Sequence, residues 1–185
     1  FPGKKVFDMR TLMITDNVED MNGPKLDKTI IGGNFARWYG GFQSFTVASH
    51  FRNQVYTQTS HAMMQDEARI QELEHLPRMN WTEWMRTLST FKYAVHLMPT
   101  VAAGTFSLNC AYYGIPCIGN KDVDTQNTCH PDLSVDVNDV EQAVKLAIRL
   151  RDDEEFYSTC SEMAKFGYEE HYTEEKWKAK MENIL

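Results

Sequence analysis

The sequence predicts an α/β fold, a Rossmann-like doubly wound parallel sheet with helices on both faces and a C-terminal helical tail. Short β-branched apolar runs alternate along the chain with longer stretches in which apolar residues recur at helical spacing. The last two helical stretches follow each other without an intervening strand. Nothing repeats at a fixed period, and no internal boundary interrupts the pattern. We therefore expect residues 1–28 to be a linker or N-terminal extension and residues 29–185 to form one domain.

Five short apolar runs have the length and the β-branched composition of strands. They are residues 29–31, 55–57, 93–97, 115–118 and 133–135. Residues 11–14 fit either a further strand or the preceding linker. Residues 68–76 fit neither the strand period nor the helical period cleanly, so their structure is left open.

Amphipathic spacing and capping residues predict six helices, over residues 37–51, 82–90, 105–113, 140–150, 155–167 and 173–185. Asn80 is a candidate N-cap for the second helix, and Asn138 or Asp139 for the fourth. Gly114 suits the left-handed conformation that often follows a helix C-terminus.

The first predicted helix carries a stripe of large residues. Trp38, Phe42, Phe45 and Ser49 recur at helical spacing, so we expect this stripe to face the core. We accordingly interpret Trp38, Tyr39 and Phe42 as helix packing rather than as a platform for a sugar.

Charge and composition exclude several classes of protein. The chain has 19 Lys and Arg against 26 Asp and Glu, a net charge of −7, and no long basic cluster, so it is a poor candidate for a nucleic-acid binder. No apolar run approaches the ~20 residues that span a bilayer, which excludes a transmembrane protein. The four cysteines form no C-x-x-C pair, and Cys110 and Cys117 fit small core residues in a reducing, cytoplasmic setting. Because the chain opens on Phe1 without a signal-peptide pattern, we expect it to begin inside a longer polypeptide.

Two predicted strand-to-helix turns carry candidate ligand residues, because ligands of open parallel sheets bind beyond the carboxyl ends of the strands. The first is residues 32–37, where Gly33 and Asn34 would let a ligand approach the backbone and Arg37 would donate to a phosphate. The alternative is a tight turn with a surface arginine.

The second turn is the predicted first turn of helix 105–113 and contains Gly104, Thr105, Phe106 and Ser107. Unpaired backbone N–H groups and the helix dipole make such an end an anion site, and the two hydroxyls add donors. We expect a bulky side chain at Gly104 to block the anion. The alternative is a capped core helix that binds no ligand.

Residues 91–99, 104–109 and 111–118 resemble the C-terminal, donor-binding domain of GT-B-fold glycosyltransferases of the group 1 type. In that family a strand ends near Pro-Ser or Pro-Thr, here Pro99-Thr100, and a glycine turn and a helix ending in Gly-x-Pro follow. Residues 133–139, 152–155 and 172–177 resemble the flanking segments of the same domain. The resemblance covers the chain from about residue 29 to its end.

The resemblance implies that residues 29–185 bind a nucleoside diphosphate sugar, with no further cofactor, and that an N-terminal acceptor domain is absent from this chain. No metal site is expected, because His61 and His75 have no second ligand at i+4. The backbone of residues 104–107 would hold the diphosphate, and Arg37 resembles the family's basic phosphate contact. Arg78 and Met79 fall where the family's nucleobase contacts lie. The alternative for Arg78 is a solvated loop residue.

One departure from the family pattern concerns two glutamates that many retaining members carry around the glycine turn. Here Asn109 and either Val101 or Ala102 occupy those places, so no catalytic residue is identified. Asn109 would still bond a ribose hydroxyl. A non-catalytic nucleotide-binding or interaction module with a degenerate GT-B-like fold is therefore an alternative, as is another doubly wound enzyme such as a sugar-nucleotide epimerase. We interpret His96, inside an apolar strand, as a core histidine with a satisfied partner.

Overall fold

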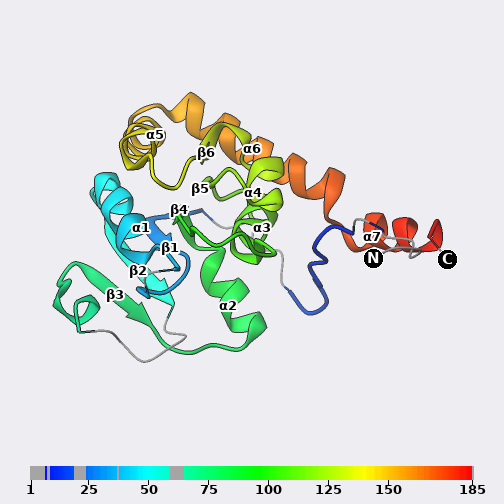
Figure 1. The fold of residues 1–185 in the computed structure, drawn as a ribbon, viewed down its shortest axis with the longest axis horizontal. Helices are drawn as coiled ribbons and strands as arrows, with labels where there is room; N and C mark the ends of the chain where they lie inside the picture. Colours follow the sequence, from blue (N-terminus) through cyan, green and yellow to red (C-terminus); the bar gives the residue numbers. More distant parts are fainter. Residues whose placement is uncertain (1–6, 8, 19–23, 37, 59–64, 185) are drawn as a thin grey trace, which may run out of the picture.

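The computed structural model describes residues 7, 9–18, 24–36, 38–58 and 65–184. Six parallel strands form one sheet in the order β3-β2-β1-β4-β5-β6 (Figure 1). Since β1 and β4 are neighbours in the sheet but not in sequence, the strand order reverses between them. That reversal is the topological switch point of a doubly wound sheet, beyond which ligands bind. The strands are β1 (Leu26–Ile31), β2 (Gln54–Gln58), β3 (Leu73–Leu76), β4 (Phe91–His96), β5 (Cys117–Asn120) and β6 (Ser134–Val135).

Helices cover both faces of the sheet, as predicted (Figure 1). Helices α1 (Gly41–Ala48) and α5 (Val140–Asp152) pack on one face. Helices α2 (Trp81–Leu88), α3 (Thr105–Tyr112) and α4 (Asp124–Cys129) pack on the other face. The predicted helical tail is α6 (Glu154–His171), which contributes to both cores, and α7 (Glu174–Glu182).

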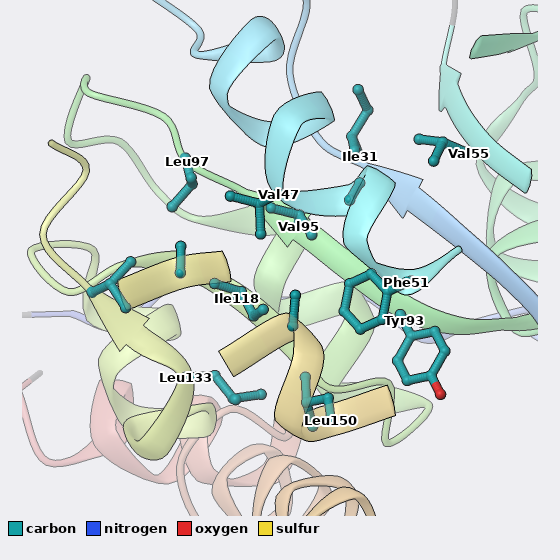
Figure 2. Packing of buried hydrophobic residues seen from close by; sticks show 14 of the residues in the cluster. Ile31, Val47, Phe51, Val55, Tyr93, Val95, Leu97, Ile118, Leu133 and Leu150 are labelled. Carbon is teal, nitrogen blue, oxygen red and sulfur yellow. The ribbon is translucent and has the colours of Figure 1, made fainter. Parts of the chain in front are cut away.

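Strand β5, most of β4 and the second half of β1 are buried on both faces, which is why they read as apolar runs, whereas β2 and β3 are partly exposed. Ile30 and Ile31 are both buried, yet they belong to different cores because successive side chains point to opposite faces. Figure 2 shows the core under α1 and α5, where Phe51 stacks on Tyr93 with ring centroids 4.2 Å apart. Fully burying one such aliphatic or aromatic side chain contributes about 1.5–3 kcal/mol, so the two cores hold the sheet in place.

Several elements differ from the sequence-based expectation in their bounds. Strand β1 begins at Leu26 rather than at residue 29, and residues 11–14 have no regular secondary structure. The ambiguous stretch contains β3 at its end. Helix α4 was not predicted, because its sequence Asp-Thr-Gln-Asn-Thr-Cys is short and lacks an apolar stripe.

The expected buried stripe of the first helix is wrong. Helix α1 begins only at Gly41, and its buried residues are Gly41, Ser44, Val47 and Ala48. An added Cβ at Gly41 would lie 2.6 Å from the Asn34 carbonyl oxygen, so a side chain does not fit at this position. Of the predicted stripe, Phe45 does pack partly buried against the core, whereas Trp38 is 61% exposed and Phe42 is 41% exposed, although Phe42 meets Phe35 edge-to-face. Helix packing therefore does not explain Trp38.

Among the described residues, no helix has the length and apolar character to cross a membrane. All four cysteines are buried and free, as expected for Cys110 and Cys117.

Candidate functional site

The N-terminus of α3 lies at the carboxyl edge of the sheet, after β4. It begins at Gly104, which has a left-handed φ of 68° and provides no side-chain cap. The first three N–H groups of the helix, at residues 105–107, have no intrahelical acceptor. Thr105 is exposed, as are the three residues before Gly104. This end of the helix is therefore open, and the helix dipole favours an anion there.

The inner side of the same turn is built from buried hydroxyl groups. The Gly104 carbonyl oxygen accepts hydrogen bonds from Thr125 Oγ1 at 2.8 Å and from Ser107 Oγ at 3.0 Å. The Ser107 hydroxyl is thus engaged within the protein, and of the two predicted hydroxyl donors only that of Thr105 faces solvent. A Cβ at Gly104 would point at Thr125 and Val123. A bulky residue there would therefore disturb this inner packing.

The turn after β1 packs against the α3 turn. An added Cβ at Gly32 would lie 2.8 Å from both the His96 ring and the Phe106 ring, so these rings require a glycine. Gly33 has a φ of 76°, in the left-handed region. The Asn34 side chain accepts a hydrogen bond from the Ala36 N–H at 2.9 Å and so stabilises the turn in which it lies. Arg37, the expected phosphate contact, lies outside the described residues.

His96 lies between the two turns, at the end of β4. Its ring meets Phe106 edge-to-face with centroids 5.0 Å apart. The ring as a whole is half-buried, but its Nε2 atom is fully buried and has no hydrogen-bond partner among the described residues. The expected satisfied partner is therefore not found. Loss of solvent around the ring lowers the pKa of His96 to about 4, so the imidazole is neutral at pH 7.

A cavity of about 370 Å³ opens beside the α3 turn. Thr11 Oγ1 donates to the Ala103 carbonyl oxygen at 2.9 Å, which holds the segment before β1 against this cavity. The residues lining the cavity are mostly apolar: Leu12, Met13, Ile14, Trp81, Thr105, Leu108 and Asn109. Its volume lies within the range of small-molecule sites.

Asn109 lines this cavity, but its amide is engaged in packing. In the orientation that satisfies both amide atoms, Nδ2 donates to the Thr105 carbonyl oxygen at 3.0 Å and Oδ1 accepts from Trp84 Nε1 at 3.3 Å. Asn109 thus joins α3 to α2, and these contacts use one donor and one acceptor position of its amide.

The segment after β3 leads into α2. Arg78 is exposed, whereas Met79 is half-buried and its sulfur accepts a hydrogen bond from Thr87 Oγ1 at 3.3 Å. Asn80 closes the N-terminus of α2, because its Oδ1 accepts from the Glu83 N–H at 3.0 Å and Glu83 Oε2 accepts from the Asn80 N–H at 2.9 Å.

The structure brings some of the candidate residues together and separates others. The turn that contains Gly33 meets the α3 turn at the switch point through Gly32, which packs on Phe106, whereas Arg78 and Met79 follow β3 at the sheet edge. Sequence reasoning missed Trp81, which directly follows the N-cap Asn80. Its side chain is 38% exposed and lines the same cavity as Thr105 at the α3 turn.

Solved structures with this architecture share little sequence with the chain. TarM of S. aureus, in a mutant complex with fondaparinux, alpha-GlcNAc-glycerol and UDP, matches 100% of the chain at a TM-score of 0.76 and 11% identity. HepE of Anabaena, in complex with UDP and glucose, matches 85% at a TM-score of 0.68 and 8% identity. The neighbours of this kind are GT-B glycosyltransferases. The chain has a GT-B domain fold.

A third neighbour is the sucrose-phosphate synthase of Thermosynechococcus elongatus, which matches 85% of this chain at a TM-score of 0.66 and 15% identity. The chain covers only 40%, 47% and 44% of TarM, HepE and the synthase, less than half of each. No protein-family model and no curated protein matches the sequence.

Proposed function

We propose that this chain is the donor-binding domain of a glycosyltransferase that transfers a sugar from a nucleoside diphosphate sugar to an acceptor. The observation that carries the proposal is the open N-terminus of α3 at the switch point, beside a cavity large enough for a nucleoside. Support comes from the GT-B fold and from the UDP in the complexes of TarM and HepE. The donor would be the only small molecule required, and the four free, buried thiols favour a reducing compartment such as the cytoplasm.

The residues at the N-terminus of α3 would contribute to the reaction by electrostatic stabilisation. In the transfer, an acceptor oxygen forms a bond to the anomeric carbon of the sugar while the bond from that carbon to the diphosphate breaks. Negative charge then grows on the diphosphate, and the N–H groups of residues 105–107 together with the helix dipole would stabilise it. The acceptor and its general base would belong to a second domain, as in a two-domain enzyme. We therefore expect the isolated chain to bind the donor and to transfer sugar poorly.

One observation favours the alternative of a non-catalytic nucleotide-binding module. The positions where retaining relatives carry glutamates hold Asn109, whose amide is engaged with Thr105 and Trp84, and an exposed apolar residue at Val101 or Ala102. Nucleotide binding without any turnover, even in the presence of a complete acceptor domain, would favour this alternative.

The experiment that tests the proposal is a calorimetric titration of the chain with UDP, GDP, ADP and their glucose conjugates. We expect saturable binding to one site with a clear preference for one base. The sugar conjugate of the preferred nucleotide should also bind, because the diphosphate contacts are shared. Failure of all six compounds to bind would contradict the proposal.

A further inference from the structure

The junction of α6 and α7 forms a cavity that shares no lining residue with the cavity beside the α3 turn. Its volume is about 170 Å³, and the segment before β1 contributes one side of it (Figure 1). Three of its lining residues are cationic, namely Arg10, Lys176 and Lys180. Glu170 is the only carboxylate among the described residues that line it. The wall is therefore positively charged, although the chain as a whole carries a net charge of −7.

Arg10 is fixed in this wall by contacts that leave most of its donors free. Its Nη1 donates to Thr128 Oγ1 on α4 at 3.3 Å, and its guanidinium lies 5.1 Å from the centroid of the Tyr172 ring. The Tyr172 hydroxyl donates to Asp124 Oδ2 at 2.6 Å, which holds the ring in place. In the part of the chain that the structure describes, no carboxylate forms an ion pair with Arg10. Because a guanidinium has five N–H donors, Arg10 can bond a ligand without leaving its position.

The two lysines are available to the same ligand. Lys176 Nζ lies 3.6 Å from Glu170 Oε2, and both side chains are about half exposed. Such an exposed ion pair contributes little, so the ammonium group can turn toward an anion in the cavity. Lys180 forms no ion pair with any described residue. Lys176 and Lys180 lie one turn apart on the same face of α7 and repel each other, and an anion between them would relieve this repulsion.

We propose that this cavity is an anion site, separate from the donor site, that binds the phosphate group of a phosphate ester. Arginine binds phosphate through its fork of N–H groups and lysine through its point charge. The cavity is smaller than sites that enclose a whole small molecule, so the remainder of the ligand would lie outside it. The half-buried Trp177 lines the cavity and offers an apolar surface for that remainder. Thr11 also lines the cavity and bonds the Ala103 carbonyl oxygen, so the anion site borders the α3 turn.

The anion site is tested by calorimetric titration of the Thr105→Glu variant with inorganic phosphate and with glucose 6-phosphate. The added carboxylate repels phosphate from the α3 turn and leaves the cavity unchanged, because Thr105 does not line it. We expect both compounds to bind saturably to this variant. Glucose 6-phosphate should bind more tightly, because its sugar can lie on Trp177. Equal affinities would overturn the esterified ligand and leave a site for free phosphate.

Further substitutions in the Thr105→Glu variant locate the bound phosphate. Arg10→Gln should weaken phosphate binding at least tenfold, because charge-assisted hydrogen bonds are lost, and Lys180→Gln should weaken it severalfold. Lys178→Gln is the matched control, since Lys178 is an exposed residue of α7 that pairs with Glu174 at 2.7 Å and does not line the cavity. It should bind phosphate as the parent does. Lys180→Gln decides the test even if Arg10→Gln detaches the segment before β1.

Two results would overturn the anion site: no phosphate binding to the Thr105→Glu variant, or equal losses in Lys180→Gln and Lys178→Gln. Its separation from the donor site is tested in the wild-type chain, where glucose 6-phosphate should still bind when UDP is saturating. Mutual exclusion of the two ligands would overturn that separation. If the wild-type chain binds no UDP, the proposed function fails for UDP, while the titrations of the Thr105→Glu variants still decide the anion site.

Discussion

Helices α1 and α3 both follow strands that meet at the switch point, and both begin at a left-handed glycine without a side-chain cap. Their surroundings differ. At α1 an added Cβ would collide with the Leu97 carbonyl oxygen at Gly40 and with the Asn34 carbonyl oxygen at Gly41, and both glycines are buried. At α3 the obstacles behind Gly104 are side chains, and Thr105 is exposed. A left-handed glycine before a helix is therefore not by itself an anion site, and we expect one only where the first N–H groups of the helix reach solvent.

The largest expected effect concerns the closed turn. Gly40→Ala should cost about 4–5 kcal/mol of unfolding free energy, because its left-handed φ of 65° is strained for alanine and the added Cβ would collide with the Leu97 backbone carbonyl. Gly104→Ala should cost less, about 2–3 kcal/mol, because the Thr125 and Val123 side chains can turn away. Urea unfolding measures both variants, and an equal cost would contradict this difference between the turns.

The second effect is the pH dependence of the unfolding free energy, which we expect to come from the two histidines that pack against the α3 turn. His96 touches Phe106, and His130 Nε2 bonds the Ser107 carbonyl oxygen at 3.0 Å; desolvation lowers the pKa of each to about 4. The unfolded chain, with histidine pKa values near 6.5, takes up these protons first as the pH falls. Stability is therefore fully present above about pH 6.5 and declines toward pH 4, by about 2 kcal/mol for each histidine at pH 5.

Unfolding of the wild type and of His96→Phe at pH 7.5 and pH 5 checks this dependence. The variant should lose about half of the wild-type difference between the two pH values. A wild-type unfolding free energy that does not fall over this range would show that both histidines are accessible to protons in the folded chain.

The third effect concerns the open turn. Thr105→Glu places a carboxylate in the first turn of α3, where it suits the helix dipole but repels a diphosphate. We expect nucleotide affinity to fall at least tenfold, about 1.4 kcal/mol, with the melting temperature unchanged or raised. Thr105→Gln is the neutral control and should bind as the wild type does.

The smallest effect concerns α2, whose N-terminus a side chain closes. Asn80→Ala removes the capping box with Glu83 and should cost about 1 kcal/mol of stability. Its effect on nucleotide affinity should be negligible, because Asn80 serves the helix rather than a ligand. A large loss of affinity without a loss of stability would instead place Asn80 in the binding site.

The fold class could be predicted from the sequence because it depends on local signals. These are apolar runs of strand length, apolar residues at helical spacing, and residues that begin or end helices, such as Asn80, Asp139 and Gly114. It failed where tertiary contact decides. Trp38 and Phe42 fit a buried stripe, yet the side of α1 that faces the core is the one on which the Asn34 carbonyl oxygen leaves no room for a side chain at Gly41.

The candidate site was predicted at the level of its turns but not of its side chains. Residues 104–107 do form the start of a helix at the sheet edge. That Ser107 bonds inward depends on Thr125, and that Asn109 packs on Trp84 depends on α2; neither contact has a local signal in the sequence. The unpartnered nitrogen of His96 likewise follows from the packing of Gly32 and Phe106 around it.

The most direct test of the central claim is a paired titration of Thr105→Glu and Gln43→Glu with UDP. Gln43 is an exposed residue in the first turn of α1, so the two variants place the same charge in the first turn of each helix. We predict that Thr105→Glu loses UDP affinity at least tenfold and that Gln43→Glu keeps the wild-type affinity. Equal losses in both variants, or a loss confined to Gln43→Glu, would contradict the assignment of the phosphate site to the open turn of α3.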